Sequence, residues 1–328
     1  MNFEQLFSGF SSIKVAIVGD VMLDTYWWGN VDRISPEAPV PVVALQRKEL
    51  RVGVAANVAL NSVSMGAQTT IISVIGNDED GRKLLRLLNA HQINTDHILR
   101  SDKRITTNKT RVMSRNQQMM RLDAEIIADI DTETEDRLVQ NIAEYFQKDK
   151  PDVLIFEDYN KGVLTERVIT ALIKLCRENN VVTSVDPKKK NFLAFRGVTI
   201  FKPNLKEVKE GLNLSTENVS LSSLQEIHKV LQQHLHHQIS FITLSEKGVF
   251  YQDAEKVKII PTHIRNIADV SGAGDTVIAV ASLVYATTKN MRLAAEMANI
   301  AGGLVCEEVG TAAINKSKFL KECELLLG

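Results

Sequence analysis

Short apolar runs alternate with helix-like segments along this chain, and the alternation limits its possible folds more than any other feature. Runs rich in β-branched residues predict buried strands at 14–19, 69–75, 152–156, 181–185 and 240–244. Segments with helical spacing lie between them, at 54–65, 79–90, 165–178 and 220–234. This order indicates an α/β fold with a central, mostly parallel sheet and helices on both faces.

A parallel sheet also predicts where a site should lie. Ligands of such sheets bind beyond the carboxyl ends of the strands. The polar residues that follow the predicted strands are Asp20, Glu157, Asp158, Asp186 and Ser245.

Two segments, at about 24–45 and 106–123, lack helical spacing and are rich in residues that favour strands. They predict extended strands outside the main sheet. A small sheet over the strand ends would form a lid, and an edge extension with no functional part is the alternative. We expect one domain over 1–328 that includes this lid.

Composition excludes several classes of partner. The chain has 39 basic and 40 acidic residues spread along its length, so neither a nucleic acid nor an anionic membrane is an expected partner. No apolar run approaches the roughly 18–20 residues that a membrane span needs. The first twelve residues lack the basic and apolar regions of a secretion signal, and the three cysteines form no Cys-x-x-Cys pattern. We therefore expect a cytoplasmic protein without disulfides or structural zinc.

The stretch 269–276, Asp-Val-Ser-Gly-Ala-Gly-Asp-Thr, is the strongest local motif. Gly272 and Gly274 permit a tight turn, and the apolar run after it predicts a buried helix. Free N–H groups and the positive dipole end at such a helix start favour a phosphate. Asp275 has two interpretations at this point: a helix cap, or a base that takes a proton from an attacking hydroxyl.

Two common nucleotide-binding patterns fit poorly. A dinucleotide fold needs Gly-x-Gly-x-x-Gly after the first strand, but only Gly19 is there and Asp20 follows it. A P-loop needs Gly-Lys-Ser or Gly-Lys-Thr, and neither tripeptide occurs in the chain.

Two separated signatures resemble the ribokinase (PfkB) family of carbohydrate kinases. The first is carried by Gly53, Asn57, Gly66 and Gly76 at the family's spacings, and the second by 269–275. The resemblance implies a ribokinase-like fold and ATP-dependent transfer of a phosphoryl group to a sugar. It also implies that Asp275 is the catalytic base.

The remaining site residues are carried over from the family's motifs onto this sequence. The anion hole would be formed by Gly272, Ala273 and Gly274. The implied sugar ligands are Asp20, Asp24, Gly53 and Asn57. The implied ATP and Mg²⁺ element is Asn204, Leu205, Lys206 and Glu207, with Glu207 toward the metal, and the nucleotide loop and adenine side are Ser245, Lys247, Gly248 and Asn299. The resemblance further implies a monovalent cation such as K⁺, held in part by Asp269.

Within the family, several stretches resemble the members that phosphorylate D-glycero-β-D-manno-heptose 7-phosphate at C1, a step toward ADP-heptose and the lipopolysaccharide core. These stretches are 18–24, 33–43, 114–118, 158–162, 186–188 and 310–311. A sugar 7-phosphate needs its own anion site, for which the candidates are Arg111, Arg115, Lys161 and Lys188, with Asn116 beside them; solvated surface charge is the alternative for each cation. Such members are often fused to an adenylyltransferase domain, and since the sequence ends at Gly328 we expect a stand-alone kinase. The lid resembles the sheet through which family members pair, which predicts a homodimer.

One residue departs from the family pattern. Val54 stands where the family's Gly-Gly-Ala-Ala-Asn has its second glycine. Glycine there implies a close backbone approach or a positive φ, which a β-branched residue resists. We hypothesise a weakened or altered sugar site, so a kinase for another sugar or sugar acid, and a silent sugar-binding relative, stay open as alternatives.

Overall fold

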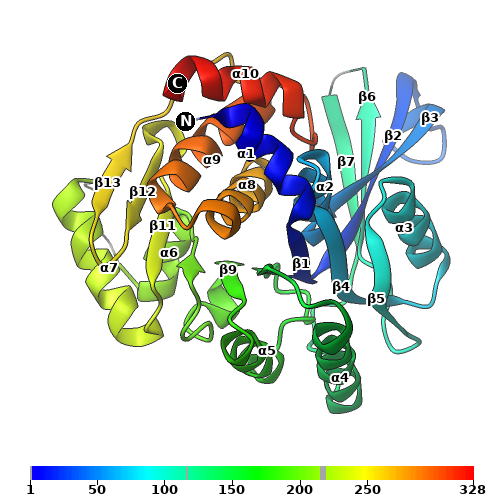
Figure 1. Cartoon of the computed structure of the whole chain (residues 1–328). Helices are drawn as coiled ribbons and strands as arrows, with labels where there is room; N and C mark the ends of the chain where they lie inside the picture. The colour runs from blue at the N-terminus through cyan, green and yellow to red at the C-terminus, as the bar shows by residue number, and fades with distance from the viewer. Residues whose placement is uncertain (1, 116, 215–218) are drawn as a thin grey trace.

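The structure is a computed structural model that describes residues 2–115, 117–214 and 219–328. In these residues the strands form a nine-stranded sheet and a separate four-stranded sheet (Figure 1). The large sheet has the order β13-β12-β11-β10-β9-β8-β1-β4-β5. Its strands are β1 (Lys14–Gly19), β4 (Gln68–Gly76), β5 (Asn94–Ser101), β8 (Val153–Glu157), β9 (Val182–Asp186), β10 (Ile200–Phe201), β11 (Ile239–Thr243), β12 (Val249–Gln252) and β13 (Val257–Ile260). Pairing is parallel from β5 to β11, and β12 and β13 extend the sheet antiparallel, so the predicted α/β fold is confirmed.

Helices cover both faces of the large sheet, as the alternation predicts. They are α1 (Phe3–Gly9), α2 (Ala55–Ser64), α3 (Glu79–Ala90), α4 (Thr132–Asp149), α5 (Glu166–Glu178), α6 (Leu205–Leu212), α7 (Leu221–Leu235), α8 (Ala273–Thr288), α9 (Met291–Val305) and α10 (Lys316–Leu327). One buried apolar cluster joins the sheet to α1, α2, α3, α8, α9 and α10, and a second joins the opposite face to α4, α5, α6 and α7. Side chains alternate along each strand between these two cores, and this alternation decides which strand-end residues lie below α8.

The two segments that break the alternation form the four-stranded sheet, in the order β3-β2-β6-β7. Its strands are β2 (Val21–Ile34), β3 (Pro41–Val54), β6 (Asn108–Ser114) and β7 (Gln117–Ala124). The prediction of strands outside the main sheet is therefore confirmed. Because β2 follows β1 directly and β3 leads into α2, both connections to the large sheet pass the carboxyl ends of its strands.

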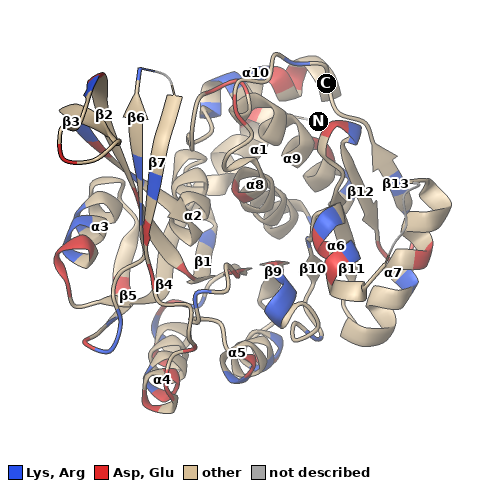
Figure 2. Ribbon diagram, turned by 180° about the vertical axis from the view of Figure 1, so that it is seen from behind, with Lys and Arg blue, Asp and Glu red and all other residues tan. Residues whose placement is uncertain are grey.

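Charged residues are distributed over the whole ribbon, with basic and acidic positions interspersed on helices and on both sheets (Figure 2). Among the described residues, no helix combines the length and apolar character that crossing a membrane requires.

Candidate active site

The 269–276 motif forms the tight turn that opens α8. Gly272 is the N-cap of this helix and has φ 78°, a conformation that glycine adopts without strain. A Cβ on Gly272 would lie 2.7 Å from Nδ2 of Asn57, so the close approach of α2 also requires glycine here. Asp275 lies in the first turn of the helix rather than at the cap, so the capping interpretation of Asp275 is wrong.

Asp275 is buried and held from two sides. The Asn57 side-chain amide donates to Oδ2 of Asp275 at 2.8 Å, and the Tyr159 hydroxyl donates to Oδ1 at 3.3 Å. Burial raises the pKa of Asp275 to about 6, with Asn57 opposing the shift and Asp186 adding to it. A carboxyl with this pKa is ionised at neutral pH yet binds a proton readily, which suits a general base.

Asn57 lies on α2, one turn beyond the strained start of that helix. Its Oδ1 is buried without a hydrogen-bond partner among the described residues, so the amide can still accept a bond from a ligand. Val54, the N-cap of α2, has φ 63° and ψ −130°, which confirms that this position needs the positive φ the family's glycine implies. The Asn61 side chain then ties α2 to α8, since its Oδ1 accepts from Thr276 Oγ1 at 3.1 Å.

The turn also carries the N–H groups expected to bind a phosphate. The Ala273 N–H donates to the Val270 carbonyl at 3.3 Å, so it must exchange this partner before it can bind a phosphate oxygen. A Cβ on Gly274 would lie 3.9 Å from Nζ of Lys202 and 3.8 Å from Oδ2 of Asp186. A buried cation therefore lies close to the turn.

Asp24 and Gly53, two of the predicted sugar ligands, lie on the paired strands β2 and β3, two positions apart in register. A Cβ on Gly53 would lie 2.9 Å from Oδ2 of Asp24, so a side chain at 53 would displace this carboxylate. Asp24 is buried and forms an ion pair with Arg111 of β6. Arg111 also lies over the Tyr26 ring, 5.3 Å from its centroid, and one cation thus joins β6 to two residues of the adjacent strand β2.

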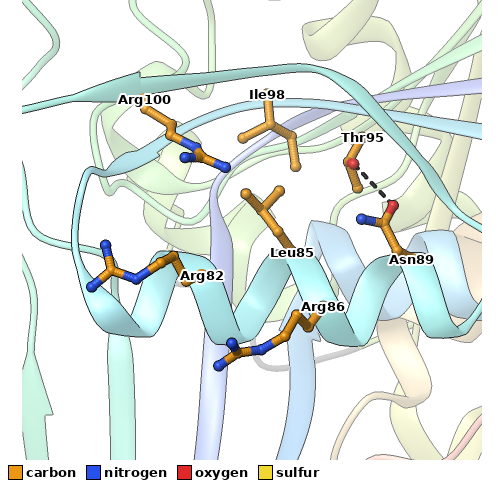
Figure 3. Close-up of a pocket in the computed structure, with 7 residues that line it drawn as sticks. All are labelled: Arg82, Leu85, Arg86, Asn89, Thr95, Ile98 and Arg100. Atoms are coloured by element: carbon orange, nitrogen blue, oxygen red, sulfur yellow. Dashed lines mark hydrogen bonds between the residues drawn. The ribbon is translucent and has the colours of Figure 1, made fainter.

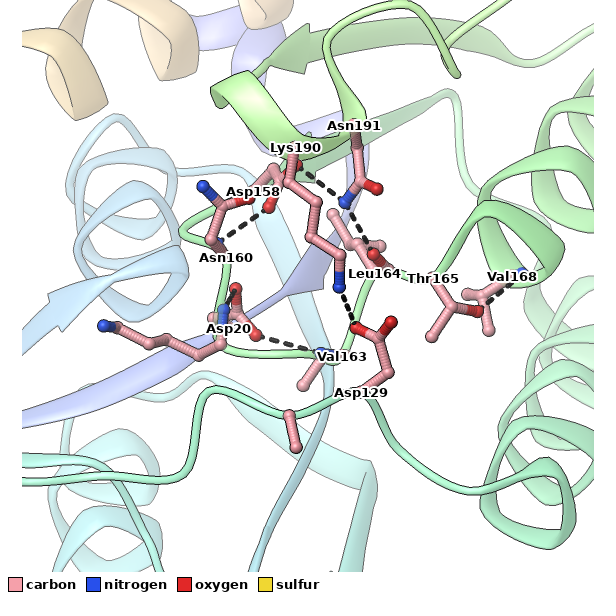
Figure 4. Close-up of polar contacts among 12 residues, drawn as sticks. Asp20, Asp129, Asp158, Asn160, Val163, Leu164, Thr165, Val168, Lys190 and Asn191 are labelled. Carbon is pink, nitrogen blue, oxygen red and sulfur yellow. Dashed lines mark hydrogen bonds and ion pairs between the residues drawn. The ribbon is translucent and has the colours of Figure 1, made fainter.

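Asp20, another predicted sugar ligand, is held by the backbone of the loop after β8. Its carboxylate accepts hydrogen bonds from the backbone N–H groups of Tyr159, Lys161 and Val163 at 3.0–3.1 Å. The bond from Val163 is drawn in Figure 4. Both oxygens are used to hold the loop after β8, and Tyr159 of this loop contacts Asp275. Asp20 therefore positions this loop, and its implied role as a sugar ligand stays a prediction.

The candidate cations for a sugar phosphate lie apart. Arg115 is exposed at the β6–β7 turn with φ 54°, and Lys161 forms an ion pair with Glu125 at 2.8 Å. Lys188 lies instead between Asp186, at 3.3 Å, and Glu207. Lys188 thus lies beside Glu207 of the predicted ATP and Mg²⁺ element, and its role toward a sugar phosphate stays a prediction. Asn116 lies outside the described residues.

The predicted nucleotide elements meet at the ends of β10 and β11. Asn204 and Glu207 form a capping box at the start of α6, so Leu205 and Lys206 occupy its first turn. Asn204 forms a β-bridge with Thr243 of β11. A short 3-10 helix, Ser245–Lys247, follows β11 and ends at Gly248. On α9, the Asn299 amide donates to the Pro261 carbonyl at 2.8 Å.

Asp269, the predicted cation ligand, closes the turn before α8. Its Oδ1 accepts from the N–H and hydroxyl of Ser271, at 2.9 and 2.8 Å, and its Oδ2 accepts from the Gly310 N–H at 2.9 Å. Those contacts fix the 310–311 segment beside the helix start. Among the described residues, no cluster of three or more His, Cys, Asp or Glu side chains could hold a metal by itself.

A surface hollow of about 380 Å³ lies elsewhere, between α3 and β5 (Figure 3). Arg82, Arg86 and Arg100 line it, and the first two pair with Glu79. It is remote from the carboxyl ends of β8 to β11, where the polar groups converge, so we do not place the site there.

Four buried or half-buried residues complete the site, and the motifs did not assign them a role: Glu157, Tyr159, Asp186 and Lys202. Positions 157 and 186 were predicted only as strand ends facing a site. Lys202 carried no signal except its place just before Asn204, at the end of a strand.

This sheet order, with a glycine turn at the start of α8 and a small second sheet, defines the ribokinase-like class of α/β proteins. The chain belongs to the pfkB family of carbohydrate kinases, whose model matches residues 12–318. It is therefore an ATP-dependent phosphotransferase acting on a carbohydrate.

Curated relatives extend over nearly the whole chain. The bifunctional protein HldE of Syntrophotalea carbinolica is 37% identical over 316 residues, which are 96% of this chain and 64% of that protein. HldE of Citrifermentans bemidjiense is 38% identical over 322 residues, 97% of this chain and 65% of its own length. The chain thus spans a little under two thirds of these relatives.

Solved structures support the fold. Phosphofructokinase-2 from Escherichia coli, in complex with potassium, superposes with a TM-score of 0.80 at 17% identity, covering 96% of this chain and 99% of that one. Arabidopsis thaliana ribokinase, complexed with ribose and ATP, gives 0.72 at 15% identity, covering 94% and 99%. At these identities the likeness concerns the fold alone.

Proposed function

We propose that this chain transfers the γ-phosphoryl group of ATP to the C1 hydroxyl of D-glycero-β-D-manno-heptose 7-phosphate, giving the 1,7-bisphosphate. The observation that carries the kinase chemistry is the buried Asp275 carboxylate at the start of α8. Asn57 holds it from the side of the small sheet, and the glycine turn lies directly before it.

The proposed step follows from this placement. Asp275 takes the proton of the sugar hydroxyl as the sugar oxygen bonds to the γ-phosphorus, and the bond from that phosphorus to the β–γ bridging oxygen breaks to release ADP. The α8 turn and the helix dipole stabilise the negative charge on the transferred group. Asn57 and Tyr159 fix the direction of the carboxylate.

The choice of sugar draws on the small sheet and the adjoining loops. The stretches that resemble the heptose kinases include Asp24, Arg115 and Lys161, and the similarity to the HldE proteins spans them. The side chain of Val54, buried where the family has glycine, favours a second candidate, a kinase for another sugar or sugar acid, because it adds volume just before Asn57.

We propose that the four-stranded sheet is a lid within a single domain over 1–328 and that two lids pair in a homodimer. Large apolar side chains are exposed on this sheet and beside it, which supports pairing. They are Ile34, Val40, Leu45, Met119, Met120 and Leu122.

The residues present fit Mg²⁺ as a partner of ATP rather than as a resident ion. Glu207 accepts from the Asn204 N–H at 2.8 Å and from Lys188, so it would reach a metal through water. Phosphate oxygens and water would supply the other ligands, as is usual for Mg²⁺, which when bound neutralises phosphate charge. A monovalent cation beside Asp269 stays a prediction of the family resemblance.

A coupled assay of ADP release over a panel of sugars and sugar phosphates tests the proposal. We expect the heptose 7-phosphate to give the highest kcat/KM. A higher kcat/KM for another sugar would favour the second candidate. No ADP release with any compound of the panel would favour a silent sugar-binding relative. Asp275→Asn should lower turnover by about 10²–10⁴-fold while ATP binding persists, and surviving turnover would contradict the mechanism.

A further inference from the structure

Three residues from three adjacent strands form a row beneath the start of α8. Glu157 at the end of β8 is in register with Asp186 at the end of β9. Pairing of β10 with β9 places Lys202 next in the row, with its Nζ 2.8 Å from Oδ2 of Asp186.

This row faces α8. Ile155 of β8 and Ile200 of β10 belong to the core shared with α8, so Glu157 and Lys202, two residues further on, point to the same side. Asp275 begins its helix above them. Thus three buried carboxyl groups lie close together.

The lysines determine which carboxyl of the strand pair is ionised. Both Lys188 and Lys202 contact Asp186, at 3.3 and 2.8 Å. Glu157 is fully buried, and neither of its oxygens has a hydrogen-bond partner among the described residues. An unpaired buried charge is costly, and neighbouring carboxylates on adjacent strands repel each other, so the proton belongs on Glu157.

The charges that face Glu157 agree with this assignment. Burial, Asp186 and Asp275 raise its pKa well above 4.5, and Lys188 and Lys202 oppose the shift only in part. The Tyr159 hydroxyl also faces this carboxyl. It is neutral at physiological pH and adds no charge.

We propose that Glu157 is a positioning residue that stays protonated beneath the base, so that Asp275 is left as the carboxylate that accepts the sugar's proton. This inference rests on the proposed phosphoryl transfer. A second negative charge at 157 would raise the proton affinity of Asp275 and keep the base protonated at neutral pH. A neutral carboxyl avoids this and still fills the buried position.

Two matched isosteric substitutions test the inference. Asp186→Asn removes an ionised carboxylate from the row, so the pH at which kcat/KM falls on the acidic side should shift downward. Glu157→Gln replaces a neutral group with a neutral group and should leave this pH in place, whatever it does to kcat. A downward shift in Glu157→Gln equal to that in Asp186→Asn would overturn the inference.

Infrared spectroscopy of the ligand-free protein supplies a second readout that needs no turnover. At neutral pH, the wild-type chain should show the carbonyl stretch of a protonated carboxyl, and Glu157→Gln should lose it. No such band in the wild type, or an unchanged band in Glu157→Gln, would overturn the inference even if Asp186→Asn fails to fold. Since the spectra do not depend on kinase activity, this failure is distinguishable from failure of the proposed function.

Discussion

Val54 stores backbone strain at the entrance to the site, and two substitutions should reveal it. Its φ of 63° and ψ of −130° suit glycine, whereas β-branched residues are genuine outliers there. Such a conformation costs about 1–3 kcal/mol. The side chain is only 5% exposed, so burial offsets part of this cost.

The free energies of the two variants follow from these terms. Val54→Ala removes two buried methyl groups, worth about 1.6 kcal/mol, and keeps most of the strain. Val54→Gly loses somewhat more buried surface but releases the strain. Its free energy of unfolding should therefore lie within about 1 kcal/mol of the wild-type value. The glycine variant should therefore be more stable than the alanine variant by about 1–2 kcal/mol, the reverse of the usual order, in which glycine costs roughly 0.5–1 kcal/mol relative to alanine.

Urea denaturation of both variants measures this order. Val52 is a matched control, because it is equally buried on the same strand and has no positive φ. At 52 the alanine variant should be the more stable one. If the free energy of unfolding of Val54→Ala equals or exceeds that of Val54→Gly, the argument that Val54 is strained is refuted.

The same pair tests whether the strain affects the sugar site. Val54→Gly should change KM for the sugar, because Val54 caps the helix that carries Asn57. It should leave KM for ATP unchanged, because the predicted nucleotide elements lie in distant segments of the chain. Unchanged kcat/KM for the heptose phosphate would refute the hypothesis that Val54 alters the site.

Further predictions concern the base, its turn and the small sheet. The value of kcat/KM should fall as pH drops through about 6, where Asp275 becomes protonated, and a profile flat to pH 5 would contradict its role. Because the pKa of Asp275 is raised from 3.8 to about 6 in the folded state, its ionisation destabilises the fold by an amount that grows as pH rises between these two values, so Asp275→Asn should raise Tm at pH 8 and lose this gain only as pH falls below 3.8. Gly272→Ala should lower kcat by about 10²–10³-fold, because its Cβ would meet Asn57 and displace the turn. Gly9→Ala is the control: a Cβ there meets nothing within 4 Å, so kcat should not change. Arg111→Met leaves buried Asp24 unpaired and should cost about 1–3 kcal/mol in urea denaturation, and adding Asp24→Asn should restore stability without restoring the KM for sugar.

Local sequence patterns predicted the parts of this molecule that depend on short segments. Apolar runs and helical spacing located the strands and helices that they predicted within a residue or two, because each of these elements buries a face set by its own side chains. The departure at Val54 predicted either a close backbone approach or a positive φ, and the structure has the positive φ, since the need for glycine is a property of one residue. By contrast, the ion pairs of Lys188 with Asp186 and Glu207 depend on two distant segments, and no local pattern predicted them.

Asp20 shows why residue type alone does not settle a role. A carboxylate after the first strand suits a sugar hydroxyl, and it suits three backbone N–H groups equally well. Which of them it meets depends on the loop after β8, over a hundred residues later in the chain. The row of Glu157, Asp186 and Lys202 extends the same reasoning: each lies at the end of a different strand or just beyond it, and only the register of these strands places Asp186 between Glu157 and Lys202. Since the charge of each depends on the others, the chemistry of the site beneath Asp275 is a property of the assembled sheet.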